Sequence, residues 1–266
     1  MPTIIIDNKP YEAKTGETIL EVAIREGIWI PTLCYHPSLR GYAACRLCLV
    51  EIDRGSWRQI VTSCNYPIRK DIKAWVNSER ALKARKGVME LLLARSPDSQ
   101  ELKTLAERMG IYSTSYPKVT ESQRNCILCG LCTRVCAEVI GQSAISLSGR
   151  GVERVVSTPF QLASDQCIAC GACASICPVG TIQIRMHDEE IEISPFKSKV
   201  PMPRCRECGK HLASSKVGEK VMELLSDNYP DETLKSLKEI IMLCPDCRRK
   251  RSAEALPKSY SDLLCC

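Results

Sequence analysis

The sequence predicts an α+β protein that is divided into several small modules. Three observations support this fold class: strand-like segments surround one amphipathic helix near the N-terminus, the middle of the chain is helical, and 18 cysteines stand in close groups on either side of that middle. A chain of 266 residues would ordinarily form one or two domains. Cysteine pairs and triplets at C-x2-C spacing indicate metal ligands rather than disulfides, and metal-held modules fold with cores that are otherwise too small.

Residues 1–78 are predicted to form strands around a single helix. "TIIID" and "KPYEAK" form a hairpin across Asp7-Asn8, and "ETILEVAIREG" forms a helix that ends at Gly27. "LCLVEID", "RQIVTSC" and "IKAWV" are the remaining strands. The apolar face of the helix is expected to consist of Ile19, Leu20, Ala23 and Ile24.

Four cysteines of this module are spaced like the ligands of an iron–sulfur site. They are Cys34, Cys45, Cys48 and Cys64. Three thiolates from one loop and a fourth from a distant strand suit a [2Fe–2S] cluster, in which each iron takes two cysteines. The alternatives are buried thiols or a zinc site, although zinc more often uses two C-x2-C pairs. His36 lies beside the loop and is expected to pack or to form a hydrogen bond rather than to bind metal.

The motifs "PTLCYHPSL" and "CRLCLVEI" resemble one family of N-terminal β-grasp [2Fe–2S] ferredoxin domains. That family comprises the diaphorase-linked iron–sulfur subunits of cytoplasmic NAD(P)-linked hydrogenase and formate dehydrogenase complexes, which are related to the large iron–sulfur subunit of respiratory complex I. The resemblance extends to about residue 195. It implies that the four cysteines just named hold a [2Fe–2S] cluster.

An internal repeat follows, in "NCILCGLCTRVC" and "QCIACGACASICP". Both copies have the C-x2-C-x2-C-x3-C spacing of bacterial two-cluster ferredoxins, in which each fourth cysteine binds the other cluster. We therefore assign one [4Fe–4S] cluster to Cys126, Cys129, Cys132 and Cys177, and a second to Cys136, Cys167, Cys170 and Cys173.

Two glycines and one alanine in this repeat carry conformational predictions. Gly130 and Gly171 are expected to adopt positive φ close to the clusters. Ala137 follows Cys136, whereas Pro178 follows Cys177 as the pattern expects. We expect the alanine to alter the local turn without removing a ligand.

The cysteine-free middle is predicted to form two helices. Ser78 caps the first, which runs to about Arg95, and Asp98 and Glu101 start the second, which ends at Gly110. In the related proteins this segment carries a histidine and three cysteines that bind a further [4Fe–4S] cluster. Ser96 stands about where that histidine would be, so the cluster is expected to be lost. The apolar face of the first helix is expected to contain Leu82, Met89, Leu92 and Leu93.

Two C-x2-C pairs lie beyond the resemblance. Cys205, Cys208, Cys244 and Cys247 indicate a zinc-ribbon-like module, with a third [4Fe–4S] cluster as the alternative. "GEKVMELLSD" and "DETLKSLKEIIML" are predicted helices, and His211 is expected to lie on the surface. Cys265 and Cys266 are interpreted as free thiols or a partner contact. The apolar core of this module is expected to consist of Leu224, Leu225, Leu237, Ile240 and Ile241.

The predicted organisation has five parts. They are the [2Fe–2S] domain at 1–78, a helical segment at 79–117, a two-[4Fe–4S] domain at 118–197, the four-cysteine module at 198–252 and a tail at 253–266.

The predicted function is electron transfer, with no catalytic residue of the chain's own. No G-x-G-x-x-G follows a strand and there is no P-loop. We expect a subunit between a flavin- and NAD(P)H-binding iron–sulfur subunit and the catalytic unit of a hydrogenase. The lost cluster indicates an altered path, as in an electron-bifurcating assembly that uses ferredoxin. Formate dehydrogenase is the second candidate for the catalytic unit, and an NADH-dependent transhydrogenase the third.

Partners of other kinds are not expected. The N-terminus lacks a signal peptide and no segment has eighteen uninterrupted apolar residues, so we expect a cytoplasmic protein without a membrane span. The net charge of +6 is spread along the chain, apart from "CRRKR". A zinc-rich module that binds nucleic acid is the alternative from a different class, and the brown colour of an iron–sulfur protein would exclude it.

Overall fold

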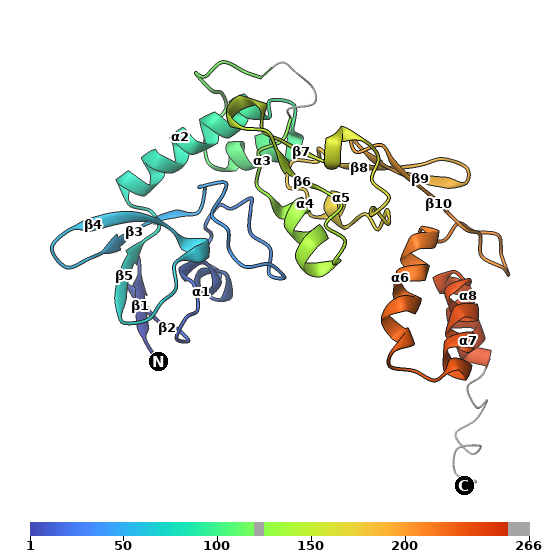
Figure 1. The fold of residues 1–266 in the computed structure, drawn as a ribbon. Coiled ribbons are helices and arrows are strands. Elements are labelled where there is room, and N and C mark those ends of the chain that lie inside the picture. Colours follow the sequence, from blue (N-terminus) through green and yellow to red (C-terminus); the bar gives the residue numbers. More distant parts are fainter. Residues whose placement is uncertain (120–124, 255–266) are drawn as a thin grey trace, which may run out of the picture. The chain divides into compact units, whose positions relative to one another are not determined.

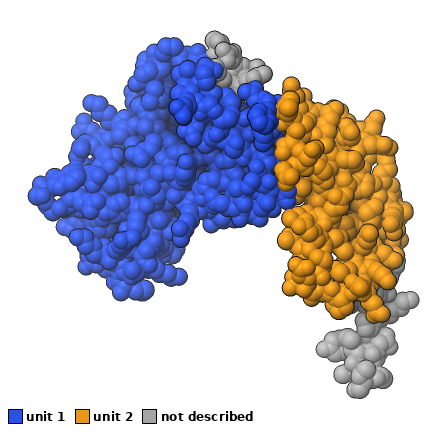
Figure 2. Space-filling view, viewed as in Figure 1, with its two compact units in different colours: residues 1–161, 172–183 blue, residues 162–171, 184–266 orange. Residues whose placement is uncertain are grey.

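The computed structural model describes residues 1–119 and 125–254 (Figure 1). The chain forms two compact units, one of residues 1–161 and 172–183, the other of residues 162–171 and 184–266 (Figure 2). No helix in the described ranges is both long enough and apolar enough to cross a membrane.

The N-terminal part of the first unit is a five-stranded sheet with one helix against it. The strand order is β2-β1-β5-β3-β4, in which β1 and β5 are parallel. The predicted hairpin is confirmed, because Ile6 pairs with Lys9 and both Asp7 and Asn8 have positive φ. The elements are β1 Thr3–Ile6, β2 Lys9–Glu12, α1 Ile19–Arg25, β3 Leu49–Asp53, β4 Arg58–Thr62, the 3-10 turn η1 Ser63–Asn65 and β5 Ile72–Trp75.

Helix α1 begins at a complete capping box, in which the Thr18 side chain accepts from the Glu21 amide and Glu21 accepts from the Thr18 amide. Its buried side chains are Ile19, Leu20, Val22 and Ala23. The prediction for Ile24 was wrong, since 54% of this residue is exposed. The buried stripe is centred on Val22 and Ala23, three and four residues after Ile19, and Ile24 falls outside it.

Helices α2 and α3 occupy the cysteine-free middle. Helix α2 spans Glu79–Arg95 with Ser78 as its N-cap, as predicted. Met89 and Leu93 are buried, but Leu82 is 50% exposed, so its predicted place on the apolar face was wrong. The buried face of α2 runs through Ala81, Arg85, Met89 and Leu93 at four-residue intervals, and Leu82 falls beside it.

Helix α3 spans Gln100–Arg108. Its N-cap is Ser99, whose hydroxyl accepts the amide of Leu102, so the predicted start at Asp98 was one residue early. A serine hydroxyl and an aspartate carboxylate serve this position about equally well, and the sequence offers both side by side. Gly110 follows the helix with positive φ, as the predicted stop requires.

Short elements surround the cysteine repeat of the first unit. They are α4 Leu131–Arg134, the π-helical turn η3 Val135–Val139, β6 Ser146–Ser148, η4 Gly151–Glu153, β7 Val155–Ser157, η5 Pro159–Gln161 and α5 Ala172–Ser175. The expected altered turn is present, because the chain continues through Cys136 and Ala137 as the π-helical turn. Proline at position 137 would lack the amide that a helical turn uses.

The second unit contains a three-stranded sheet and three helices. The sheet has the order β10-β9-β8, and Ile191, Ile193 and Val200 are buried. No side chain of α6 or α7 is buried, and Leu224 and Ile240 are 63% and 41% exposed, so the predicted apolar core was wrong for these two residues. The elements are β8 Gln183–Met186, β9 Glu190–Ser194, β10 Ser198–Pro201, α6 Ser215–Ser226, α7 Asp231–Ile241 and α8 Pro245–Glu254.

Candidate iron–sulfur and metal sites

The four N-terminal cysteines come together in the buried interior of the first unit. Three of them lie in the loop between α1 and β3, and Cys64 lies in η1. At most 3% of each residue is exposed. The Ser63 amide and hydroxyl both donate to the Cys48 carbonyl, at 2.9 and 2.8 Å, which ties η1 to the end of the loop. The tertiary fold therefore brings Cys64 to the other three.

The sulfur atoms of this group interact with one another and with backbone amides. Hydrogen bonds from the Cys45 and Cys64 thiols lower the pKa of Cys34, whose sulfur also accepts the Cys45 amide at 3.4 Å. A hydrogen bond with Cys64 lowers the pKa of Cys48 to about 7. Thiolates are the form that binds iron, and donors aimed at sulfur stabilise them. This donor set fits a [2Fe–2S] cluster, whose four ligands are all thiolates.

Gly41 lets this loop approach the fourth ligand closely. A Cβ atom at position 41 would lie 1.9 Å from the carbonyl oxygen of Cys64 and 2.6 Å from its carbonyl carbon. Only glycine fits such a contact between two backbones. His36 accepts the Ser38 amide at 3.2 Å through Nδ1, which confirms its predicted hydrogen-bonding role.

The first repeat of cysteines shares a hydrophobic core with Cys34 and Cys45. Cys129 and Cys132 are each 7% exposed, and Gly130 between them has φ of +75°, as predicted. Burial raises the pKa of Cys126 and raises that of Cys129 to about 12. Cys177, from the second repeat, lies near enough for its charge to raise both pKa values further. The structure thus brings together the four cysteines assigned to the first [4Fe–4S] cluster, and the assignment itself stays a prediction.

The cysteines assigned to the second [4Fe–4S] cluster are less buried. Cys136 lies in η3 and Cys173 in α5, both in the first unit, while Cys167 and Cys170 belong to the second unit. Cys170 is exposed and the other three are half-buried. Gly171 has φ of +76°, as predicted. The ligand set of this cluster also stays a prediction.

The loop of the N-terminal site packs directly against the loop of the first repeat. One hydrophobic core contains Cys34, Cys45 and Cys129. The Arg134 guanidinium donates to the Arg40 carbonyl at 2.7 Å and lies 5.4 Å from the centroid of the Tyr42 ring. Arg40 and Tyr42 belong to the loop that carries three of the N-terminal ligands, so these contacts hold the two cysteine groups side by side.

The end of α2 supports the loop that carries the first cysteine repeat. Ser96 is completely buried, and its hydroxyl donates to Oδ1 of Asn125 at 2.7 Å. Arg95 donates to the Cys126 carbonyl at 3.0 Å, and Thr181 donates to the carbonyl of Asn125. Ser96 is therefore a structural contact to the cysteine loop.

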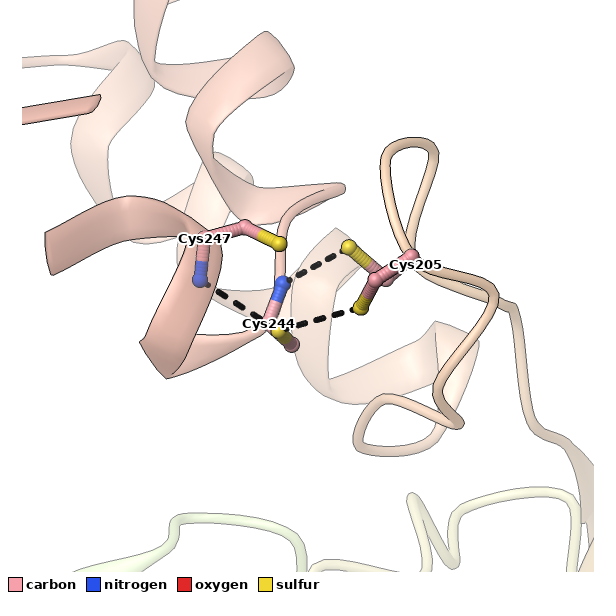
Figure 3. A group of neighbouring side chains, drawn as sticks. Cys205, Cys244 and Cys247 are labelled. Carbon is pink, nitrogen blue, oxygen red and sulfur yellow. Dashed lines mark hydrogen bonds between the residues drawn. The ribbon is translucent and has the colours of Figure 1, made fainter. Parts of the chain in front are cut away.

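The C-terminal cysteines form a compact group in the second unit. Figure 3 shows Cys205, Cys244 and Cys247 with their sulfur atoms directed toward a common point. The Sγ atoms of these three and of Cys208 all lie within 4.8 Å of one another, and those of Cys208 and Cys244 are 3.5 Å apart. The Cys244 amide donates to the sulfur of Cys205 at 3.2 Å. This site could hold a metal ion.

Residues around this group join its two halves. Lys210, beside the first cysteine pair, binds Asp246, beside the second, at 2.9 Å. Leu243 is buried with Cys205 and Cys244, and His211 is exposed as predicted. Helix α8, which carries Cys247, was not predicted because its sequence is almost entirely polar and has no apolar period. Cys265 and Cys266 lie outside the described residues.

Sequence reasoning missed three residues that shape these sites. The three residues contact main-chain atoms beside the cysteines. Gly41 lies against the backbone of Cys64, and the side chains of Arg85 and Arg134 donate to the carbonyl oxygens of Leu49 and Arg40. A backbone approach or a carbonyl acceptor leaves no motif, so no sequence signal could have identified them.

Two domain families match parts of the chain. Residues 1–79 match the 2Fe-2S iron–sulfur cluster binding domain, and residues 125–181 match the 4Fe-4S dicluster domain. The predicted fold class is confirmed by these matches together with the C-terminal four-cysteine group.

Curated relatives extend the similarity beyond single domains. The NADP-reducing hydrogenase subunit HndD of Solidesulfovibrio fructosivorans is 35% identical over 211 residues, which cover 68% of this chain and 36% of the relative. The NADPH-Fe(3+) oxidoreductase subunit alpha of Geobacter sulfurreducens is 32% identical, with 68% and 24% covered. The NADH-ubiquinone oxidoreductase 75 kDa subunit of Reclinomonas americana is 27% identical, with 85% and 35% covered. The chain thus spans about a third or less of these relatives.

A solved structure also resembles this chain. The crystal structure of an NAD+-reducing [NiFe]-hydrogenase in the H2-reduced state contains a similar chain, with a TM-score of 0.59 and 28% identity. The match covers 67% of this chain and 85% of that one. The predicted resemblance to iron–sulfur subunits of NAD(P)-linked hydrogenases and of complex I is confirmed.

Proposed function

We propose that this chain is an electron-transfer subunit of an NAD(P)-linked hydrogenase complex in the cytoplasm. The observation that carries the proposal is the shared core of Cys34, Cys45 and Cys129, which places the predicted [2Fe–2S] ligands against those of the first predicted [4Fe–4S] cluster. When bound, such clusters supply one-electron carriers. The chain supplies their spacing and their insulation from water.

The residues between the two sites perform this positioning. Arg134 fixes the loop of Arg40 and Tyr42 over the first repeat, and Arg95 holds the carbonyl of Cys126 from the end of α2. Both arginines use main-chain acceptors, so each fixes a loop rather than a side chain. Because the two cysteine loops pack against each other, electrons could pass between their clusters without a further cluster in the middle segment.

The partners follow from the same role. The sequence contains no G-x-G-x-x-G dinucleotide-binding motif after a strand. A separate flavin- and NAD(P)H-binding iron–sulfur subunit would therefore exchange electrons with this chain, and a hydrogenase unit would complete the electron path. The similarity to an NADP-reducing hydrogenase subunit and to a chain of an NAD+-reducing hydrogenase favours hydrogenase over formate dehydrogenase or a transhydrogenase. Electron bifurcation with ferredoxin is the variant of this role that the lost cluster supports.

For the C-terminal group we propose one structural zinc ion. Four sulfurs at about 2.3 Å from a tetrahedral zinc would be about 3.8 Å apart. The sulfurs of Cys208 and Cys244 are 3.5 Å apart and all four lie within 4.8 Å. A [4Fe–4S] cluster binds each thiolate to a different iron and so separates the sulfurs further. Zinc is redox-inert, so this module would stabilise the chain or bind a partner.

The experiment is affinity purification of the complex through a tag on this chain, followed by identification of its subunits. We expect flavin and hydrogenase subunits, and hydrogen-dependent reduction of NAD or NADP. Cys48→Ser should abolish that coupled activity while the flavin subunit still reduces an artificial acceptor. A tagged chain that is colourless, or that copurifies with nucleic acid, would refute the proposal.

A further inference from the structure

Arg85 is a buried cation next to the N-terminal cysteine site. It lies in α2, and only 3% of the residue is exposed. Its Nε donates to the carbonyl oxygen of Leu49 at 2.8 Å, and its Nη2 donates to the same oxygen. Leu49 directly follows the predicted ligand Cys48. The guanidinium thus touches the backbone that carries one of the four thiolates.

No carboxylate forms an ion pair with this guanidinium among the residues that the structure describes. Glu51 on the neighbouring strand pairs with Arg80 at 2.8 Å and lies 4.0 Å from Arg58. The carboxylate of Asp7 accepts the Val76 amide at 2.9 Å and makes no ion pair with Arg85, although its charge, like that of Cys48, acts to raise the pKa of Arg85. A carbonyl oxygen alone is a weak partner for a buried guanidinium, which is unfavourable without an anion.

Burial does not discharge the group. It lowers the pKa of Arg85 to about 10, which leaves the guanidinium protonated at neutral pH. Lys83 and Lys86 on the same helix are exposed, so water screens them from the cysteine site. The packed elements therefore present a fixed positive charge to the cysteine site.

A [2Fe–2S] cluster with four thiolates would place a net negative charge close to this guanidinium, because its ligands and sulfides outweigh the charge of its two irons. Reduction adds one more negative charge, so a nearby cation stabilises the reduced form more than the oxidised form. We propose that Arg85 is the counter-cation of the N-terminal [2Fe–2S] site and raises its reduction potential. This inference rests on the proposed electron-transfer function, and it adds a residue that tunes the first site.

The test is a redox titration of the full-length chain, reconstituted anaerobically and followed through the electron paramagnetic resonance signal of the [2Fe–2S] cluster. Arg85→Gln keeps a hydrogen-bond donor and removes the charge. We expect its reduction equilibrium constant to fall at least tenfold, which is 59 mV for a one-electron couple. Arg85→Lys keeps the charge and should stay within threefold of the unmodified chain. Lys86→Gln, a charge removed from the exposed face of α2, is the matched control and should change nothing.

Each outcome decides the question. An unchanged potential in Arg85→Gln would overturn the proposal, and so would an equal shift in Arg85→Lys, which would indicate a purely structural contact. If Arg85→Gln fails to assemble the cluster, Arg85→Lys decides alone. A reduction equilibrium constant within threefold of that of the unmodified chain supports the proposal, and a larger change overturns it. A wild-type chain without any [2Fe–2S] signal would instead overturn the ligand assignment, and with it the proposed function.

Discussion

Gly41 offers the sharpest test of how the N-terminal site is built. In Gly41→Ala the new Cβ would lie 1.9 Å from the Cys64 carbonyl oxygen, whereas real Cβ atoms essentially never come closer than 3.0 Å to such an atom. One of the two backbones must therefore move by about 1 Å, and one of them carries a cluster ligand. Overpacking typically costs 1–3 kcal/mol, and because both neighbours are backbone we expect about 3 kcal/mol here.

The assay measures iron content, the [2Fe–2S] resonance signal and the thermal midpoint of the reconstituted chain. A loss of about 3 kcal/mol would lower the midpoint of a domain of this size by roughly 10 to 20 °C. The [2Fe–2S] signal should be lost or strongly weakened while the cubane signals persist. The control is Gly87→Ala, which meets no atom within 4 Å in α2 and should stabilise that helix by about 1 kcal/mol. A Gly41→Ala chain with a full [2Fe–2S] signal and an unchanged midpoint would refute the close approach.

Three further predictions concern the other sites. Cys177→Ser should damage the cluster assigned to Cys126, Cys129 and Cys132, because Cys177 lies near them; cluster-resolved spectroscopy showing damage only to the other cubane would reject the crossed arrangement. Ser96→Ala should lower the free energy of unfolding by about 1–2 kcal/mol, because it removes the donor to Oδ1 of Asn125. The control is Ser226→Ala at an exposed serine, which should change thermal stability little. Equal effects of the two substitutions would contradict a structural role of Ser96. Cys244→Ser should remove one zinc per chain and leave the iron content unchanged; a loss of about four irons instead would identify a [4Fe–4S] cluster.

The cysteine groups could be predicted from the sequence because ligand spacing is a local property. A C-x2-C-x2-C loop brings three thiolates to one cluster whatever surrounds it, so the two cysteine repeats and the C-terminal pairs were visible in the residues. Helix positions were also accessible, because capping and apolar period act within one element. Errors occurred where burial depends on neighbours: Ile24, Leu82, Leu224 and Ile240 have the right hydrophobicity but face away from the cores.

The sequence by itself predicted the iron–sulfur domains, the C-terminal four-cysteine group and the resemblance to iron–sulfur subunits of NAD(P)-linked hydrogenases. Only the tertiary structure decided that the N-terminal loop packs on the first repeat and that the backbone of Cys64 lies against Gly41. It alone also decided that Arg85 is buried without an ion-paired carboxylate among the described residues. These features depend on main-chain atoms and on residues distant in the chain, which meet only after folding. Hydrophobic burial and hydrogen bonds to carbonyl groups act between any residue types that fit, so they leave no motif to read.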